Sequence, residues 1–134
     1  MDYPFRLSVS AAGLIAACLT AASVAAHHNM SAIFDFNAPF TLEGTLVQLN
    51  WRNPHVRLIV ELTVHQEQPE TWSFEGPSAN AFRNFETDKR AFEAAVGQGV
   101  TIEALRARDG SRSGLIRVIT LPGREPISLC PQNC

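Results

Sequence analysis

The stretch that decides the fold runs from His55 to His65 and reads HVRLIVELTVH. Every second residue from Val56 to Val64 is apolar, and most residues between them are polar or charged. This period of two predicts a half-buried strand of an antiparallel sheet. The sequence therefore predicts a mainly β protein, with Val60 and Leu62 in its core or at the rim of that core.

Further strands are expected on both sides of this one. In Thr41–Trp51 the apolar positions change face between Leu46 and Val47, which indicates a β-bulge or a long bent strand that serves two sheets. Asn53-Pro54 then ends that strand, because proline cannot donate to a sheet. Three more strands are expected at 71–75, 100–108 and 114–121, the last two joined by the turn Asp109-Gly110-Ser111.

Two short helices are expected between the third and fourth strands. Ser78 is placed to cap the first, which has helical spacing over 79–85. The second is expected to carry Phe92 and Val96 inward and to stop at Gly97. Five strands with a helical insert after the third match the order of an OB-type barrel, whose first strand curls through both sheets. A six-stranded open sandwich is the alternative.

The N-terminal residues 1–26 are expected to be a signal peptide. No charge occurs from Leu7 to Ala26, and the small residues Val24-Ala25-Ala26 precede a favourable cleavage site. Cleavage there would place the protein in the periplasm or outside the cell. Alternatively, Ile15-Ala16-Ala17-Cys18 fits the box of a bacterial lipoprotein tethered through Cys18. A retained membrane anchor remains the third possibility, since such a segment can just span a bilayer.

The rest of the chain divides into an irregular N-terminal arm at 27–40, a barrel domain at 41–124 and a tail at 125–134. Little structure is expected from Pro122 onward, where three prolines occur. Ile33, Phe34 and Phe36 are expected to pin the arm to the domain. In the tail, Cys130 and Cys134 are candidates for a disulfide, because an exported chain keeps such pairs oxidised. Two free thiols in a frayed end are the other interpretation.

Composition argues against several classes of function. The net charge is −2, from 11 basic and 13 acidic residues, so no basic stripe for nucleic acid is expected. The sequence also contains no phosphate-binding loop, nucleophile elbow, His-Glu-x-x-His or four-cysteine zinc pattern. The strand carboxylates Glu43, Glu61 and Glu75 are expected to point outward into solvent. These observations favour a protein that is not an enzyme.

The histidines carry the most specific hypothesis. If His27 becomes the N-terminus, its α-amine and ring Nδ1 can chelate one metal, and His55 can supply a third nitrogen. Nitrogen-rich planar sets suit Cu(II), and His28 or the thioether of Met30 could add a ligand. His65 lies roughly 33 Å from His55 along an extended strand and cannot share a small ion with it. Alternatively, the arm is solvated and His55 caps a turn.

Several motifs together resemble a known family. They are Ala26-His27-His28, Phe34-Asp35, Leu42-x-Gly44-x-Leu46, Trp51-x-Asn53-Pro54-His55, Trp72-x-Phe74-Glu75, Pro77-x-x-Asn80, Asp109-Gly110-Ser111 and Val118-x-x-Leu121-Pro122-x-Gly123. The chain is similar over 26–124 to a family of small exported bacterial proteins that carries only a domain-of-unknown-function label. That resemblance implies export and the strand order of OB-fold periplasmic proteins, and it implies no established activity.

Three functions remain open from the sequence. The leading one is a small periplasmic binding protein that holds a copper ion or a small ligand without catalysis. The second is an interaction module that docks on an envelope protein or cell-wall polymer through the face near Arg52, Asn53 and Arg57. The third is a copper oxidase or oxygenase that uses His27 and His55. A monomer without a membrane span after cleavage, and without nucleic acid as a partner, is expected in each case.

Overall fold

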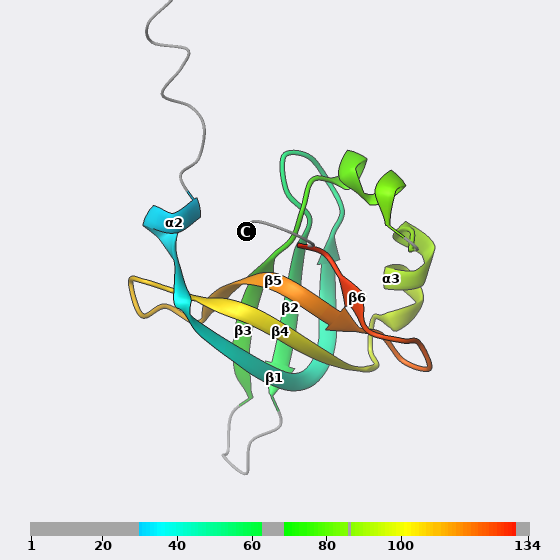
Figure 1. Cartoon of the computed structure of the whole chain (residues 1–134). Coiled ribbons are helices and arrows are strands. Elements are labelled where there is room, and N and C mark those ends of the chain that lie inside the picture. The colour runs from blue at the N-terminus through cyan, green and yellow to red at the C-terminus, as the bar shows by residue number, and fades with distance from the viewer. Residues whose placement is uncertain (1–29, 63–68, 86, 131–134) are drawn as a thin grey trace, which may run out of the picture.

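A computed structural model describes residues 30–62, 69–85 and 87–130 of the chain (Figure 1). Its elements are α2 (Met30–Ile33), β1 (Phe34–Asn50), β2 (Arg57–Leu62), β3 (Glu70–Glu75), the 3-10 helix η2 (Ala79–Asn84), α3 (Lys89–Ala95), β4 (Gly99–Ala107), β5 (Ser113–Thr120) and β6 (Ile127–Ser128). The expectation of a mainly β protein is confirmed. No helix in the described part of the chain is long and apolar enough to cross a membrane.

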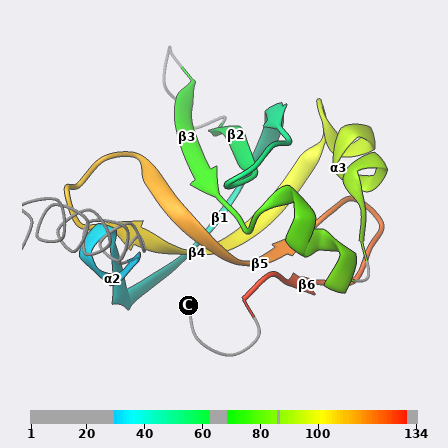
Figure 2. The ribbon, with the colours of Figure 1, turned by 90° about the horizontal axis from the view of Figure 1, so that it is seen from above.

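The strands form one strongly curved sheet in the order β3-β2-β1-β4-β5-β6, with antiparallel neighbours throughout (Figures 1 and 2). In addition, β3 pairs with β5 in the parallel direction, through Phe74 opposite Gly114 and Glu75 opposite Leu115. The described strands therefore number six rather than the expected five. Because β3 contacts both β2 and β5, the outer side chains at the end of β3 lie beside those of β5.

The long strand β1 bends as its sequence predicts. Its register with β2 shifts between Leu46 and Gln48, so the predicted bulge is confirmed. β1 pairs with β4 up to Thr45 and with β2 from Thr45 to Asn50, so the bulge lies within its pairing with β2. The prediction of an irregular segment up to residue 40 is wrong, however, because β1 already begins at Phe34. Apolar residues in fact recur at every second position from Phe34 to Leu42, with Pro39 as the one exception between them, so the stretch carries the period of a strand.

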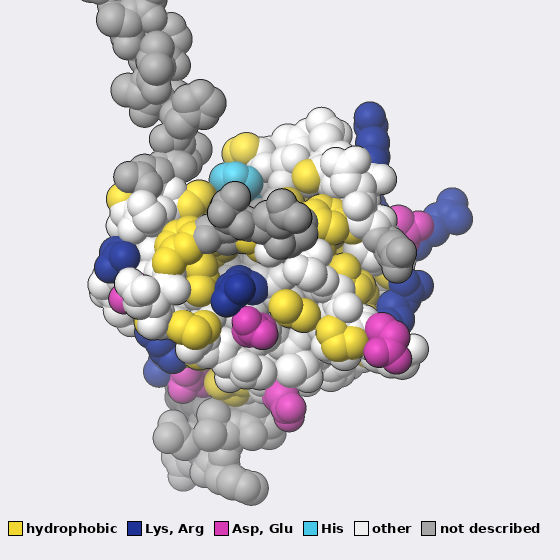
Figure 3. Space-filling view, in the orientation of Figure 1, with side chains coloured by type: hydrophobic (Ala, Val, Ile, Leu, Met, Phe, Trp, Pro, Cys, Tyr) yellow, Lys and Arg dark blue, Asp and Glu magenta, His cyan; other side chains and the backbone are white. Residues whose placement is uncertain are grey.

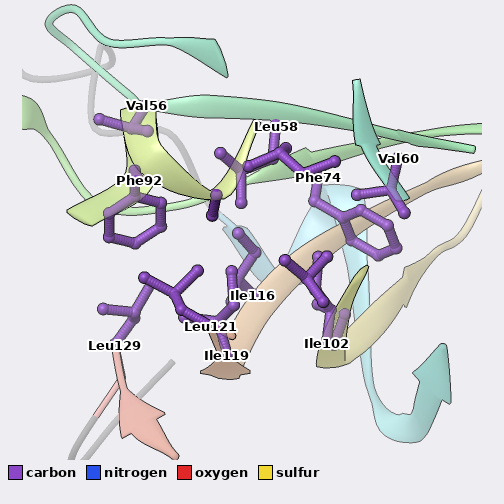
Figure 4. Packing of buried hydrophobic residues seen from close by; sticks show 14 of the residues in the cluster. Val56, Leu58, Val60, Phe74, Phe92, Ile102, Ile116, Ile119, Leu121 and Leu129 are labelled. Carbon is purple, nitrogen blue, oxygen red and sulfur yellow. The ribbon is translucent and has the colours of Figure 1, made fainter. Parts of the chain in front are cut away.

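The core lies inside the curved sheet and is closed by the helices (Figure 4). Val56, Leu58 and Val60 alternate inward from β2 and its approach, and Val60 is 0% exposed. Leu62 is half-buried against the same cluster, at its rim as expected. In Figure 4 these side chains face Phe74, Phe92, Ile102 and Ile116 across the interior. The strand assignment made from HVRLIVELTVH is therefore confirmed as far as Leu62.

Both helices form between β3 and β4, as predicted. The hydroxyl of Ser78 accepts a hydrogen bond from the N–H of Ala81 at 3.2 Å, which confirms the cap of η2. Phe92 is fully buried under α3. Val96 was expected inward but is 41% exposed. The helix ends at Ala95, and Val96 has an extended backbone that turns its side chain away from the core.

The last described residues add a short strand to the sheet and a side chain to the main core. Ile127 and Ser128 form the short strand β6, which pairs with Ile119 and Val118 of β5. The side chain of Leu129 is buried in the main core. The prediction of little structure beyond residue 124 is thus wrong at β6, since a two-residue strand has too few positions to show a period.

A second, smaller core lies on the outer face of the sheet. Phe34, Leu105, Ala107 and Leu115 are buried in it, with Met30 and Phe36 packed against them. Hydrophobic side chains gather on the surface of Figure 3 where α2 and the start of β1 meet β4 and β5. Phe34 and Phe36 therefore anchor the N-terminal segment as expected. Ile33 does not, being 46% exposed.

Candidate functional site

His55 lies in the connection between β1 and β2, and hydrogen bonds hold this connection against the end of β3. The N–H of Val56 donates to the carbonyl of Pro77 at 2.9 Å. The N–H of Gly76 donates to the carbonyl of Val56 at 2.8 Å. Two backbone hydrogen bonds on the residue next to His55 fix the position of its Cα relative to β3.

Two of the sequence motifs meet at this point. The side-chain oxygen of Asn53 accepts a hydrogen bond from the N–H of Asn80 at 3.4 Å. The Trp51 ring packs on Phe82 and Phe92, with ring centroids 4.3 and 5.3 Å apart. Both stretches, Trp-x-Asn-Pro-His and Pro-x-x-Asn, are therefore parts of one local structure supported by the core.

The side chain of His55 is held by a carboxylate. Its Nδ1 lies 2.5 Å from Oε1 of Glu75, and the second oxygen of Glu75 lies 3.7 Å from Nη2 of Arg57. The exposed fractions of the three side chains are 31% for His55, 20% for Glu75 and 52% for Arg57. The half-buried carboxylate thus connects an imidazole and a guanidinium at the protein surface.

This arrangement follows from the register of the sheet. Arg57 begins β2, Glu75 ends β3, and the two are direct cross-strand partners. Opposite charges in this position attract each other. The prediction that Glu75 points away from the core is consistent with this geometry, but the prediction that it is merely solvated is wrong. A pairing of Arg57 with Glu75 would have been visible in the sequence only if the register of the hairpin were known.

The carboxylate of Glu75 contacts one of the two ring nitrogens of His55. The contact of Nδ1 with Glu75 orients the imidazole ring of His55. In proteins, a metal-binding histidine donates from its other ring nitrogen to a carboxylate, a backbone carbonyl or a water. The pair of His55 and Glu75 is one example of an imidazole that a carboxylate orients.

Met30 and Glu75 lie on the same face of the sheet, the outer one. Glu75 is the register partner of Leu115 in the parallel pairing of β3 with β5. Leu115 belongs to the outer hydrophobic core, against which Met30 packs. Because partners in a parallel pair share a face, Met30, Leu115 and Glu75 lie on one side of the sheet.

Of the residues predicted for the metal site, His55 and Met30 lie in the described structure. His27 and His28 lie outside the described residues, as does His65, which was predicted not to share the ion. Met30 is half-buried in α2, where its side chain contacts the outer hydrophobic core. Within residues 30–62, 69–85 and 87–130, no three His, Cys, Asp or Glu side chains cluster as a metal site would.

Of the two tail cysteines, Cys130 lies within the described residues and Cys134 lies outside them. Cys130 is half-buried and disulfide-bonded. Its partner is outside the described residues, where both Cys18 and Cys134 lie. Pairing of Cys130 with Cys134 stays a prediction.

Comparison with curated proteins and with solved structures found no match. A family model does match, over residues 14–117, and it includes β1 to β4 and most of β5. It also includes His55, Arg57 and Glu75. The chain belongs to this family, which is described as a family of unknown function (DUF6152).

Proposed function

We propose that the protein is exported, that residues 1–26 are removed as a signal peptide, and that the mature protein holds a copper ion in the periplasm or outside the cell. The α-amine and Nδ1 of His27 and the Nε2 of His55 are the three nitrogen ligands in this proposal. Such a set suits Cu(II), whose affinity for nitrogen donors exceeds that of the other divalent first-row metals. His28 and the thioether of Met30 are the candidates for an additional ligand.

The observation that carries the proposal is the contact between His55 and Glu75. A lone surface histidine needs no carboxylate on its Nδ1, whereas a ligating histidine gains basicity and a fixed orientation from one. The 2.5 Å distance and the 20% exposure of the Glu75 side chain indicate a held pair rather than two solvated groups.

The path of the chain supports a meeting of His27 with His55. His27 precedes Met30 by three residues, which can span at most about 11 Å. Met30 is anchored on the outer core that includes Leu115, the neighbour of Glu75. A new N-terminus at His27 would therefore start on the face of the sheet that carries His55.

We further propose that the domain is a closed barrel of the OB type. The strand pairings support this, because the circuit β1-β2-β3-β5-β4 returns to β1 through the parallel contact of β3 with β5. The helices between β3 and β4 and the bent first strand are further features of such barrels. In this reading β6 is an addition at the rim.

The experiment is a calorimetric titration of Cu(II) into the mature protein beginning at His27. The same titration is made on a form with one additional alanine before His27, on His55→Ala, and on His65→Ala as the control. We expect the first two changes each to weaken binding by about two orders of magnitude, since each removes a nitrogen ligand. His65→Ala should bind as the parent does.

Binding should also weaken as the pH falls through the imidazole range near about 6.5, because ligand nitrogens must be deprotonated. Equal affinity of the parent, the extended form and His55→Ala would disprove the copper site. Oxygen or peroxide consumption by the copper-loaded protein would instead indicate the copper oxidase or oxygenase. Mass spectrometry of the exported protein tests the cleavage site, because lipidation at Cys18 would leave His27 internal.

A further inference from the structure

A pocket of about 510 Å³ lies between the end of η2 and the connection from β5 to β6. It is lined by Asn84, Phe85, Arg124, Glu125, Pro126, Ile127 and Ser128. Figure 2 shows β6 beside the short helix that follows β3, so segments about 40 residues apart in the chain form its two walls. The volume falls in the range of small-molecule sites in proteins, about 300–1,000 Å³.

Sheet pairing, core contacts and backbone hydrogen bonds fix the residues that form the walls of this pocket. Ile127 pairs with Ile119 in the sheet, and both Ile127 and Phe85 pack against the main core. The N–H of Phe85 donates to the carbonyl of Phe82 at 3.2 Å. On the opposite wall, the N–H of Arg124 donates to the carbonyl of Leu121 at 3.1 Å. The pocket is thus a feature of the fold, with an aromatic and an aliphatic side chain at its apolar end.

The polar side chains around the pocket have no partners among the residues that the structure describes. Asn84, Arg124, Glu125 and Ser128 make no side-chain hydrogen bond or ion pair there. All four side chains are exposed, so a ligand in the pocket could reach them. Some charged side chains elsewhere on the surface are paired, such as Arg117, which lies 3.5 Å from Glu103, and Lys89, which lies 2.9 Å from Glu93. Arg124 and Glu125 are adjacent in sequence and line the same pocket without pairing with each other.

We infer that this pocket binds a free α-amino acid with an apolar side chain. The guanidinium of Arg124 would bind the carboxylate, and the carboxylate of Glu125 would bind the ammonium group. Phe85 and Ile127 would contact the side chain of the ligand. Charge-assisted hydrogen bonds of this kind are the strong ones in recognition, and guanidinium–carboxylate pairs are frequently bidentate.

The charges of the pocket disfavour ligands that carry only one charged group. A plain carboxylic acid would satisfy Arg124 but would bring a second negative charge beside Glu125. An amine without a carboxylate would have the opposite conflict with Arg124. A ligand that carries an ammonium group and a carboxylate on one carbon can satisfy both side chains, and an apolar substituent on that carbon would cover Phe85 and Ile127.

The test uses L-leucine and L-phenylalanine, titrated into the purified protein and followed by calorimetry and by amide chemical shifts. N-acetyl-L-leucine lacks the ammonium charge, L-leucinamide lacks the carboxylate, and glycine lacks the side chain. We expect saturable binding of leucine or phenylalanine, with shifts centred on Phe85, Ile127 and Ser128. Each of the three comparison compounds should bind about tenfold or more weakly, because each loses one of the matched contacts.

The variants are Arg124→Gln and Glu125→Gln, each expected to weaken binding by about tenfold or more. Arg117→Gln is the matched control, because Arg117 is paired with Glu103 away from this pocket. Glu43→Gln is a second control, since Glu43 lines a neighbouring depression that also touches Arg124. Absence of saturable binding of both amino acids would overturn the inference. Binding that depends on Glu43, or that is unchanged in Arg124→Gln and Glu125→Gln, would overturn it as well.

Discussion

The Nδ1 of His55 lies 2.5 Å from a carboxylate oxygen of Glu75, a residue that follows it by twenty positions and ends β3. This contact exists because Arg57 and Glu75 are register partners, which brings the end of β3 beside the start of β2. The register of the sheet therefore determines the orientation of the imidazole.

Glu75→Gln should weaken Cu(II) binding by about 10–100-fold, the usual cost of losing a group that orients a metal ligand. The amide keeps the size of the side chain and removes the charge that faces the imidazole of His55. Calorimetric titration with Cu(II) measures the effect. Glu43→Gln is the control, because Glu43 is an exposed carboxylate on β1. Equal losses in both variants would show that the effect is one of net charge and not of orientation.

Val60→Asp should abolish folding. The Val60 side chain is 0% exposed, and an unpaired carboxylate in that position would cost several kcal/mol, comparable with the whole stability of a small domain. Circular dichroism during heating checks this. Val47→Asp is the control, because Val47 is 36% exposed and should tolerate a charge. A cooperative melt of the Val60→Asp protein would show that the inner face of β2 is misassigned.

Much of the fold could be predicted from local patterns in the sequence. The alternation in β2, the change of face at Leu46 and the cap at Ser78 each reflect physical rules that act within a few residues. The beginning of β1 at Phe34 could also have been predicted, because apolar residues recur at every second position from Phe34 to Leu42 and only Pro39 interrupts the pattern. The pairing of β6 could not be predicted in this way. It depends on hydrogen bonds to β5, and two residues are too few to show a period.

The candidate site could be predicted only in part for the same reason. The sequence indicated His55, because an imidazole after Asn-Pro at the start of a strand stands on its polar face. It did not indicate Glu75 as the partner, since alternation assigns a face but not a neighbour on that face. The neighbour depends on the register of β2 against β3, and no short turn signal between the two strands sets that register.

The turn between β4 and β5 gives a prediction for pH. A hydrogen bond from the Ser111 side chain, with a further one from its N–H, lowers the pKa of Asp109 below the ordinary value of 3.8. A carboxyl with a lowered pKa in the folded state stabilises the fold at pH above its unfolded value, and this contribution is lost as the pH falls through the folded value.

The stability difference between the parent and Asp109→Asn should therefore shrink as the pH is lowered from about 5 to about 2. Denaturant unfolding at a series of pH values measures it. The effect should be small, because Asp109 is fully exposed and water screens its charge. A difference that grows on acidification would contradict the assigned direction of the pKa.

The last prediction concerns the close approach of β1 and β2 just before the bulge. A Cβ on Gly44 would lie 2.6 Å from the carbonyl oxygen of Glu61 and 2.7 Å from Cγ1 of Val60. The backbone oxygen cannot move without breaking the sheet pairing. Gly44→Ala should therefore destabilise the protein by about 1–3 kcal/mol, the usual cost of overpacking.

Gly99→Ala is the matched control, because a Cβ there meets nothing within 4 Å and its backbone needs no glycine. Denaturant midpoints of the two variants, compared with the parent, test the difference. Equal stability of Gly44→Ala and Gly99→Ala would mean that β1 and β2 can separate at this point without cost, and the tight packing assigned to them would be wrong.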